Sequence, residues 1–471
     1  MNEGELLSQL GDWTRAARLL VETKANPSRG ELRRAIRDVQ RALMAERRIQ
    51  QSGEEVRDGS KKQICNGSDA EPRPLWFLNN SLPHTQSGYT LRTQESLNAL
   101  ARLNIQVSGV TRLGYPLVVG KLPTNMRESV DGISYSRILP LRYPRTLEER
   151  FQTTVESLVA EATRWHCNVI HTTTDFSNAQ VAAEAANRLG LPWVYEVRGE
   201  LHNTWLSKIP EEYRGRASQS ERYRVAQRQE LNAMKAADAI VAISEISKEK
   251  MVSRGIPSEK IFVIPNGVDS GLVGLNYDKV KLRDSLGLPH CRLVGTASSL
   301  VDYEGLDDLI RAVALDQEMM GVIVGEGVAR PDLERLARSL GVEDRLIFVG
   351  RVSRSEVWRW YAALDVFVLP RKNYEVCRTV TPVKGLIAQA LGKPIVASDL
   401  PPLREVTGGF ATFAQPGDPR DLISAIHTEL ETFDSGKRER SIEWASRHTW
   451  DSNAIRYREL YKQIRELELR G

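Results

Sequence analysis

Short runs of β-branched and apolar residues alternate with helical stretches from Pro74 onward, and this alternation constrains the fold more than any other feature of the sequence. Strand–helix alternation is typical of parallel sheets joined by right-handed crossovers. After a loop-like break at residues 265–269 the alternation starts again, so two doubly wound domains in tandem are predicted. The candidate strands are 75–79, 169–172, 193–197, 239–243 and 261–264, and then 293–297, 321–324, 346–349, 366–369 and 394–397.

The chain of 471 residues is too long for one ordinary core, and the pattern divides it into several parts. Residues 1–72 are predicted to form a helical hairpin and a linker, 73–270 the first Rossmann-like domain, 271–445 the second, and 446–471 a C-terminal helix. Parallel sheets of this kind bind ligands outside the carboxyl ends of their strands. The predicted class is therefore α/β, with two Rossmann-like domains facing a cleft and an N-terminal helical extension.

Charge and cysteine usage exclude several classes of function. Lys and Arg number 65 against 61 Asp and Glu, and a net charge of only +4 argues against a nucleic-acid-binding protein. The four cysteines lack metal-ligand or redox spacing, so free thiols and no metal site are predicted. The acidic N-terminus lacks the pattern of a secretory signal, and no apolar run approaches the ~20 residues of a membrane span. A cytoplasmic location is predicted.

The first 50 residues carry two amphipathic helical patterns. The second contains the apolar stripe Leu32, Ile36, Val39 and Leu43 among several arginines. A basic amphipathic helix can lie on an anionic membrane, here the inner face. The alternative is a hairpin that packs on its own catalytic domain or on a partner subunit, and the lack of bulky aromatic residues favours this alternative. Residues 1–50 are thus predicted to be a surface for a protein partner, self-association or peripheral membrane contact.

Three segments of the first domain suggest a ligand site. Gly88 opens a helix directly after the first strand, where free N–H groups can meet a phosphate. His171 lies at the end of one strand, and Glu196 and Arg198 end another, which would place these side chains at the ligand-binding edge. Neither domain contains G-x-G-x-x-G, so a nicotinamide-dependent oxidoreductase is disfavoured. A turn glycine and a surface Glu–Arg pair are the ordinary alternatives.

In the second domain, Gly325 follows a strand and permits close backbone approach. Further along, Thr381 is expected to cap a helix with Pro382 at its first position. Arg371 and Lys384 would then lie near the helix N-terminus, where basic side chains and exposed N–H groups form a diphosphate site. A capped helix with solvated charges is the alternative.

The order and spacing of several strings resemble the family 4 retaining glycosyltransferases, which adopt the GT-B fold. The resemblance covers about residues 74 to 465. The strings are Ser87-Gly88-Tyr89, Ala236-Ala237-Asp238-Ala239-Ile240-Val241-Ala242-Ile243-Ser244, Val263-Ile264-Pro265-Asn266-Gly267-Val268-Asp269, Tyr303-Glu304-Gly305-Leu306, Val324-Gly325-Glu326-Gly327, Phe348-Val349-Gly350-Arg351-Val352 and Gly392-Lys393-Pro394-Ile395-Val396-Ala397-Ser398-Asp399.

The resemblance implies transfer of a sugar from a nucleotide-diphosphate sugar to a glycan, lipid-linked or other glycoconjugate acceptor, as in polysaccharide biosynthesis. It implies retained anomeric configuration and no metal or other cofactor. The first domain would serve the acceptor and the second the donor, and the C-terminal helix would cross back to the first domain. Catalysis would consist of stabilising the diphosphate leaving group as its charge develops, without a protein nucleophile.

The resemblance also implies roles for particular residues. His171 would orient a sugar hydroxyl, and Arg198 would contact the transferred sugar or a phosphate. The residues expected to bind the donor are Gly88 and Gly325 in the glycine loops, Val352 near the base, and Thr381, Pro382, Val383, Arg371 and Lys384 around the diphosphate.

Several positions depart from the family pattern. Thr173 replaces a frequent second histidine, and Thr379 and Ile387 replace the two glutamates of a Glu-x7-Glu motif. Ile387 cannot accept the hydrogen bonds of the donor ribose, a loss of roughly 1.5–3 kcal/mol. Donor binding would weaken by about one to two orders of magnitude unless a neighbour such as Glu375 substitutes. The alternative function is thus a catalytically impaired member of the fold that acts as a partner or scaffold of an active transferase.

Overall fold

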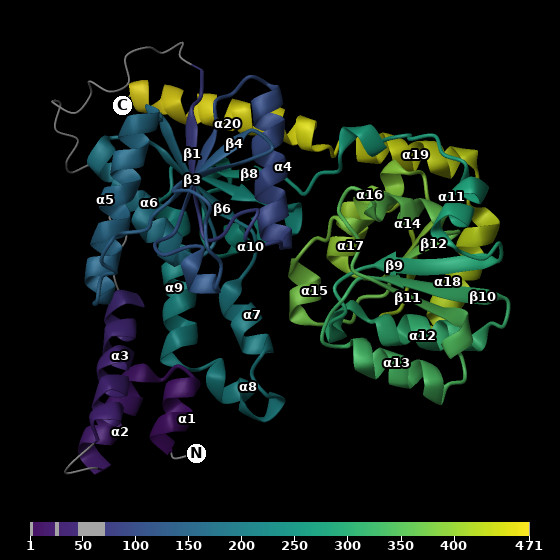
Figure 1. The fold of residues 1–471 in the computed structure, drawn as a ribbon, viewed down its shortest axis with the longest axis horizontal. Coiled ribbons are helices and arrows are strands. Elements are labelled where there is room, and N and C mark those ends of the chain that lie inside the picture. Colours follow the sequence, from purple (N-terminus) through teal and green to yellow (C-terminus); the bar gives the residue numbers. More distant parts are fainter. Residues whose placement is uncertain (1–2, 24–27, 46–70, 471) are drawn as a thin grey trace. The chain divides into compact units, whose positions relative to one another are not determined.

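The computed structural model describes residues 3–23, 28–45 and 71–470 (Figure 1). Unit 1 comprises Met1–Ile243, Lys248–Ile264 and Ala454–Gly471, and unit 2 comprises Ser244–Ser247 and Pro265–Asn453. The chain thus enters unit 2 earlier than the predicted boundary at residue 270, and it returns to unit 1 at Ala454, later than residue 446. The backbone of Val268 explains the difference, because it bonds to His448 O (2.9 Å) and Trp450 N (3.1 Å) and so ties this segment to unit 2.

Unit 1 is built on an eight-stranded sheet of order β3-β4-β2-β1-β5-β6-β7-β8. All neighbouring strands are parallel except β3 and β4, which are antiparallel. The predicted doubly wound parallel sheet is therefore confirmed. The strands are β1 (Pro74–Leu78), β2 (Ser108–Thr111), β3 (Arg127–Val130), β4 (Ile133–Arg137), β5 (Val169–Thr173), β6 (Trp193–Val197), β7 (Ala239–Ala242) and β8 (Ile261–Val263).

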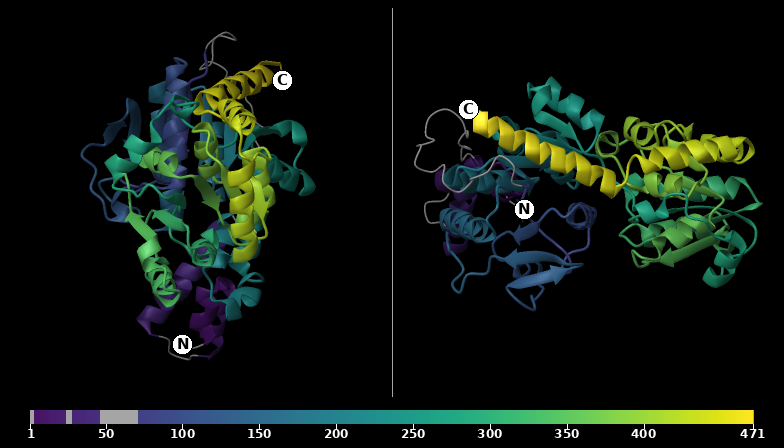
Figure 2. Two further views of the ribbon diagram at one scale, coloured as in Figure 1. Left: turned by 90° about the vertical axis from the view of Figure 1, so that its right-hand side faces the viewer. Right: turned by 90° about the horizontal axis from the view of Figure 1, so that it is seen from above.

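Helices cover both faces of this sheet. Alternate strand residues such as Phe77 and Tyr195 pack with α5 (Leu147–Trp165), α6 (Phe176–Leu189) and α9 (Glu221–Ala236) in one core. The other face, which carries Trp76 and His171, is covered by α4 (Gly88–Arg102) and by the C-terminal helix α20 (Trp450–Arg470). Figure 2 shows α20 as one unbroken helix whose C-terminal part lies against unit 1. Two short helices, α7 (Leu201–Ser207) and α8 (Glu211–Ala217), lie between β6 and α9, and α10 (Glu245–Ser253) follows β7.

The N-terminal extension forms three helices, α1 (Glu3–Gln9), α2 (Trp13–Thr23) and α3 (Arg29–Ala45). They pack on the start of α9, where Asp12 Oδ1 accepts the backbone N–H of Glu221 at 3.0 Å and the Thr14 hydroxyl donates to Glu221 at 2.7 Å. The predicted hairpin therefore has an additional first helix and packs on its own domain. The linker predicted at its end falls largely on residues 46–70, outside the described residues.

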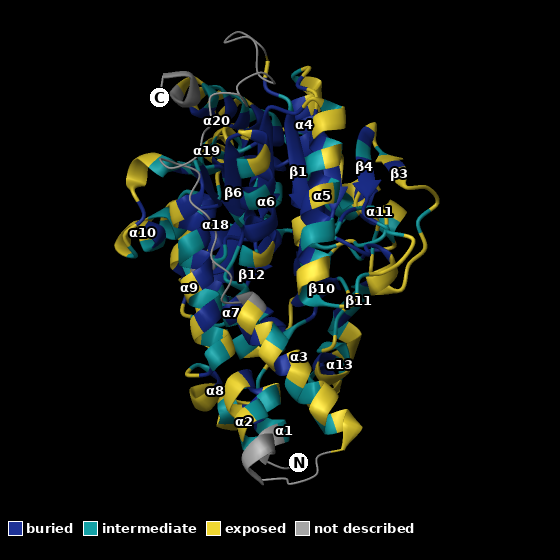
Figure 3. Ribbon diagram, turned by 90° about the vertical axis from the view of Figure 1, so that its left-hand side faces the viewer, coloured by how far each residue is buried: buried dark blue, intermediate teal, exposed yellow. Residues whose placement is uncertain are grey.

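The apolar stripe of α3 is not what holds this helix in place. Leu32, Ile36, Val39 and Leu43 are 44%, 57%, 40% and 67% exposed, whereas Asp38 is buried and accepts the Ser8 hydroxyl at 2.7 Å. Figure 3 shows the exposed residues along α3. The predicted contact of residues 1–50 with a partner or a membrane stays a prediction.

Unit 2 contains a six-stranded parallel sheet of order β11-β10-β9-β12-β13-β14. One core lies on each face. The strands are β9 (Arg292–Ala297), β10 (Met319–Val324), β11 (Leu346–Gly350), β12 (Val366–Leu369), β13 (Ile395–Ser398) and β14 (Thr412–Ala414). The helices are α11 (Lys279–Leu286), α12 (Leu306–Leu315), α13 (Arg330–Ser339), α14 (Val357–Ala363), α15 (Glu375–Thr379), α16 (Lys384–Ala390), α17 (Pro401–Thr407), α18 (Pro419–Thr432) and α19 (Ser435–Ser446).

Four strands escaped prediction, namely β2, β3, β4 and β14. They are three to five residues long, and β2 and β3 read Ser-Gly-Val-Thr and Arg-Glu-Ser-Val, which lack a clear apolar run. They form strands because they pair with neighbouring strands in the sheet, and their own residues do not indicate this. Of the helices that the structure describes, none has the length and apolar character needed to cross a membrane.

Candidate functional site

A buried ionic network lies on the face of the unit 1 sheet that α4 and α20 cover. Its centre is Glu196 near the end of β6, whose carboxylate accepts from Arg92 Nε at 2.6 Å and Arg198 Nε at 2.9 Å. Burial alone would raise the pKa of Glu196, but the charges of Arg198 and Arg92 hold it well below its usual value. The Tyr457 hydroxyl of α20 donates to the same carboxylate at 3.0 Å. The network thus joins β6, α4 and α20, which are far apart in the sequence.

His171 belongs to this network and has no exposed surface. Its ring stacks on Trp76 with a centroid separation of 3.8 Å, Nε2 lies 3.0 Å from Glu196, and Nδ1 lies 2.9 Å from the Tyr461 hydroxyl. Burial lowers its pKa, so the imidazole is neutral near pH 7. The register explains why the predicted position at the ligand-binding edge is wrong, since His171 pairs with Trp76 in the middle of β1. Its predicted role in orienting a sugar hydroxyl stays a prediction.

Arg198 links the network to the glycine segment that opens α4. Its Nη1 donates to the carbonyl of Tyr89 at 2.8 Å and to the Thr93 hydroxyl at 2.7 Å. Its Nη2 is buried and has no hydrogen-bond partner among the residues that the structure describes. Gly88 itself is exposed, follows the N-cap Ser87, and has nothing within 4 Å of the position that a Cβ would occupy. The structure therefore brings Gly88 and Arg198 together at the start of α4.

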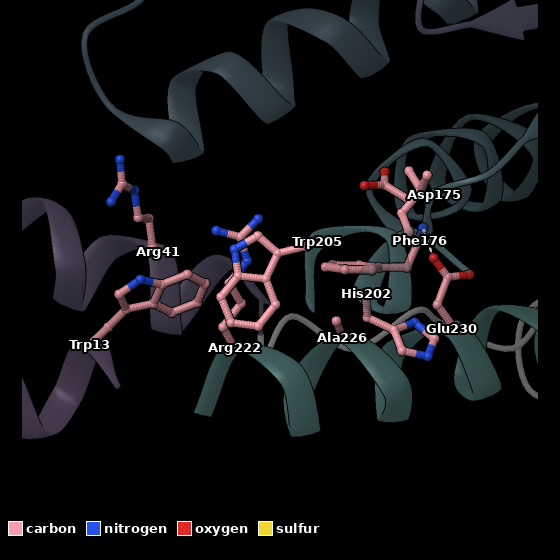
Figure 4. Close-up of a pocket in the computed structure, with 10 residues that line it drawn as sticks. Trp13, Arg41, Asp175, Phe176, His202, Trp205, Arg222, Ala226 and Glu230 are labelled. Carbon is pink, nitrogen blue, oxygen red and sulfur yellow. Dashed lines mark hydrogen bonds between the residues drawn. The ribbon is translucent and has the colours of Figure 1, made fainter. Parts of the chain in front are cut away.

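A cavity of about 380 Å³ lies beyond the carboxyl ends of β5 and β6 in unit 1 (Figure 4). Asp175 and Phe176 follow β5, and Leu201 and His202 follow β6. Aromatic, basic and acidic side chains share its wall, and two of them come from the N-terminal helices. The lining residues are Trp13, Arg41, Asp175, Phe176, Leu201, His202, Trp205, Arg222, Ala226 and Glu230.

Glu230 lines this cavity and is buried. It accepts the Phe176 backbone N–H at 2.9 Å and the Tyr195 hydroxyl at 2.5 Å. Burial, followed by the nearby charge of Asp175, raises the pKa of Glu230 to about 8. The carboxyl group is therefore mostly protonated near pH 7 and can donate as well as accept hydrogen bonds.

A neutral Glu230 predicts a particular pH dependence of stability. The folded pKa of about 8 lies above the ordinary value of 4.5, so the native protein should lose stability as the pH rises from about 4.5 to about 8. Glu230→Gln has the shape of the protonated carboxyl, and we expect it to be more stable than the native chain by about 1 kcal/mol at pH 7. Thermal unfolding from pH 5 to 8 measures this difference, which should grow with pH. Exposed Glu212→Gln is the control, and equal pH profiles for native protein and Glu230→Gln would refute the assignment.

In unit 2, two cations gather on Glu304 at the carboxyl edge of the sheet. Arg371 Nη2 lies 3.0 Å from Glu304 Oε1, and Lys384 Nζ lies 2.7 Å from Oε2. Lys384 also donates to the hydroxyl of Ser298, directly after β9, at 2.6 Å. Burial would raise the pKa of Glu304, but Lys384 and Arg371 lower it to about 2. One carboxylate thus pairs with two cations, the buried Arg371 and the partly buried Lys384, which leaves the cluster a net charge of +1.

Glycines permit the close approaches around this cluster. Gly305 has a φ of +69°, and a Cβ there would lie 1.7 Å from the carbonyl oxygen of Pro370. Gly325 has a φ of +132°, and its Cβ would lie 1.8 Å from the carbonyl oxygen of Ser298. No other residue fits at these two positions. Gly325 therefore lies beside Ser298, whose hydroxyl accepts from Lys384, and the role of both residues in donor binding stays a prediction.

The predicted helix cap at Thr381 is wrong. The helix α16 begins at Lys384 with Val383 as its N-cap, and Pro382 precedes it. The carbonyls of Val380 and Thr381 accept from Arg371 Nη1 and Asn266 Nδ2, both at 3.0 Å, and these bonds hold the segment outside the helix. The Thr381 hydroxyl is buried and has no hydrogen-bond partner within the described part of the chain.

Two other positions that were considered for donor binding, Val352 and Ile387, pack against the core of unit 2. Val352, after β11, is half-buried and packs on the unit 2 core. Ile387 lies on α16 one turn after Lys384 and is also half-buried against that core. The described residues contain no group of three His, Cys, Asp or Glu arranged to hold a metal ion.

Sequence reasoning missed the partners that complete both clusters. Arg92 and Tyr457 lie 365 residues apart, and no local pattern connects them to Glu196. Glu304 was quoted only within the string Tyr303-Glu304-Gly305-Leu306, and nothing in that string indicates that its carboxylate pairs with Arg371 and Lys384. Trp205 and Arg222, whose guanidinium lies 4.6 Å from the indole ring, fell in a segment without a readable motif.

Comparison with known proteins identifies the class. Residues 87–267 match the family described as "Glycosyl transferase 4-like domain", and residues 291–432 match "Glycosyl transferases group 1". The chain is 20% identical to sucrose-phosphate synthase from Thermosynechococcus elongatus, with a TM-score of 0.65 over 84% of this chain and all of that one. It is also 20% identical to Anabaena HepE in complex with UDP, with a TM-score of 0.63 over 83% and 100%. The fold is the GT-B fold.

Two relatives are similar in sequence over part of their length. A D-inositol 3-phosphate glycosyltransferase of Xylanimonas cellulosilytica is 30% identical over 252 residues, 48% of this chain and 57% of that protein. A GDP-mannose-dependent phosphatidylinositol monomannoside mannosyltransferase of Mycolicibacterium smegmatis is 28% identical over 251 residues, 49% and 63%. The match thus spans little more than half the length of these relatives. Together with the two matched domains, these findings place the chain in the glycosyl transferases of group 1.

Proposed function

We propose that this protein is a retaining glycosyltransferase that transfers a sugar from a nucleotide-diphosphate sugar to a glycan or lipid-linked acceptor. Unit 2 would bind the donor and unit 1 the acceptor. The observation that carries this proposal is the cluster of Arg371 and Lys384 on Glu304 at the carboxyl edge of the unit 2 sheet. The buried Arg371 and the partly buried Lys384, which leave the cluster a net positive charge, suit a diphosphate. The Thr381 hydroxyl, which has no partner among the described residues, lies three positions before Lys384 in the sequence.

The same residues account for the chemistry. As the bond from the sugar to the diphosphate breaks, negative charge develops on the leaving oxygen. Arg371 and Lys384 are already desolvated and held in place by Glu304, so they can stabilise this charge without reorganisation. Arg198 of unit 1 has a buried Nη2 without a described partner, which supports its proposed contact with the transferred sugar or a phosphate. The relative named as GDP-mannose-dependent, and HepE in complex with UDP, support a nucleotide sugar as donor.

Thermal unfolding with UDP, GDP, ADP and their common sugar conjugates tests the donor site. A ligand at about 100 times its dissociation constant stabilises by roughly 2.7 kcal/mol. We expect one nucleotide family to produce such a shift, and release of the nucleoside diphosphate from its sugar conjugate then tests turnover. Binding without turnover would favour the alternative, a catalytically impaired partner of an active transferase. The absence of any shift at millimolar ligand would refute a donor site.

Ile387 allows a direct test of the changed glutamate position. The side chain is half-buried and lies one turn after Lys384 on α16, so a carboxylate there can keep contact with water. We expect Ile387→Glu to tighten binding of the donor found by the panel by about tenfold, because it restores a charged hydrogen bond. Ile387→Gln, which accepts without charge, should gain less. Loss of stability without tighter donor binding would mean that the pocket is rebuilt around isoleucine.

A further inference from the structure

The N-terminal helices close one side of the cavity in unit 1. Trp13 begins α2 and Arg41 lies on α3, and both line the cavity together with residues of α7 and α9 (Figure 4). This position is fixed by backbone contacts, since the Gly11 carbonyl accepts the Arg222 N–H at 3.0 Å. A Cβ at Gly11 would lie 2.4 Å from the Arg222 Cβ, so α2 packs directly against the start of α9. The extension therefore supplies part of the cavity wall.

His202 is a buried residue of the cavity wall whose ring nitrogens lack hydrogen-bond partners within the described structure. It is only 6% exposed. Burial lowers its pKa to about 4, so the neutral ring presents one donor and one acceptor. Leaving both without partners in a buried position costs free energy. A sugar hydroxyl, which both donates and accepts, is complementary to such a ring.

The opposite part of the wall is aromatic and positively charged. Trp13, Phe176 and Trp205 offer ring faces, on which the apolar faces of sugars can pack. The Arg222 guanidinium lies 4.6 Å from the Trp205 ring. Burial, followed by the charge of Arg41, lowers the pKa of Arg222, and the smaller effect of Asp175 opposes this shift. The two arginines are thus close enough to repel each other. In the described structure Arg41 pairs with the buried Asp38 at 3.4 Å, and its side chain is 53% exposed. An anion between the two arginines would relieve their repulsion.

The cavity continues along the sheet. A neighbouring cavity of about 680 Å³ shares Trp13, Arg41, Asp175 and Phe176 with it and extends to Asn79 and Arg112 after β1 and β2. The carboxyl ends of the strands are where doubly wound sheets bind ligands. An acceptor longer than one sugar residue can therefore lie along this edge.

We propose that the cavity formed by Trp13, Arg41, His202, Trp205 and Arg222 is an acceptor subsite that binds a sugar residue bearing an anionic group. The N-terminal helices complete this subsite by supplying Trp13 and Arg41. The aromatic faces pack on the ring, His202 bonds a hydroxyl, and Arg41 and Arg222 bind the carboxylate or phosphate. This inference rests on the proposed function and names its acceptor class.

Binding of small probes to the full chain without donor tests the subsite. The probes are methyl β-D-glucuronide and glucose 6-phosphate, and methyl β-D-glucoside and inorganic phosphate serve for comparison. Calorimetry and saturation-transfer NMR measure the binding of each. We expect at least one anionic sugar to bind about tenfold more tightly than the neutral glycoside. Which of the two binds more tightly distinguishes a carboxylate from a phosphate. Equal binding of the neutral glycoside, equal binding of inorganic phosphate, or no binding of either anionic sugar would overturn the proposal.

Three variants locate the binding. Arg41→Gln should weaken binding of the anionic sugar by about tenfold, whereas Arg37→Gln, one turn earlier on α3 and outside the cavity, should not. His202→Phe keeps the edge contact with Tyr223 and should weaken sugar binding while raising the melting temperature of the free protein. A purely structural histidine would lose stability instead. Equal effects of Arg41→Gln and Arg37→Gln on sugar binding would refute the subsite. Thermal stabilisation of the same variants by nucleotides tests the proposed donor site separately.

Discussion

Replacing Glu196 by glutamine is expected to destabilise unit 1 by about 3–5 kcal/mol, because removal of one partner from a buried ionic network leaves the other charges uncompensated. Glu196 has no exposed surface and holds Arg92 and Arg198, which are 4% exposed each. Glutamine has nearly the same shape, so packing is retained and the lost charge is isolated. In thermal unfolding of the full chain, the lowest transition should fall by on the order of 10 °C.

The effect should depend on pH in a defined direction. The folded pKa of Glu196 lies well below its usual value, so its contribution is complete above a pH of about 4.5 and is lost as the pH falls through the folded pKa. Native protein and Glu196→Gln should therefore approach each other in stability on acidification. Glu184→Gln, which breaks an exposed pair with Arg188 on α6, is the control and should cost less than about 0.5 kcal/mol. A loss that small for Glu196→Gln would show that the network does not hold unit 1 together.

The same network shows how far the sequence determines the site. The pair Glu196 and Arg198 was predicted at a strand end because Glu-x-Arg closes an apolar run, and both residues are there. Their burial was not predictable, because it depends on α20, which begins more than 250 residues later in the chain. His171 illustrates the same limit. Its strand was recognised from its own residues, but its depth within the sheet follows from register with β1.

Local rules also failed where distant contacts hold the backbone. Thr-Pro is a good helix start, yet Arg371 and Asn266 bind the carbonyls of Val380 and Thr381 and delay the helix to Lys384. Arg371 and Lys384 nevertheless both pair with Glu304 in the structure, and their role at a diphosphate stays a prediction. Contacts made by the N-terminal helices were not predictable, since their amphipathic pattern does not specify which surface they cover.

Lys384 provides the second large expected effect, now on catalysis. Lys384→Gln should lower kcat/KM for the donor found by the nucleotide panel by about 100- to 1000-fold, the range for loss of one fixed group that stabilises developing charge. Folding should be retained, because Arg371 continues to pair with Glu304. Because the donor diphosphate is charged before the reaction and gains further charge as the bond to the sugar breaks, KM should rise and kcat should fall. Release of nucleoside diphosphate measures both parameters.

Two further substitutions test whether the positive charge of Lys384, and not its packing, is what catalysis needs. Lys384→Arg keeps the charge and should recover activity to within about tenfold of the native value, whereas a residue needed only for packing would not be rescued by the longer side chain. Lys372→Gln removes a nearby cation that pairs with Asp302 and Asp307, and it should change kcat/KM by less than about twofold. If Lys384→Gln is folded and turns over donor at the native rate, the cluster on Glu304 does not stabilise a leaving diphosphate. The cations would then serve the architecture of unit 2, as expected for a scaffold protein that has kept the fold without the reaction.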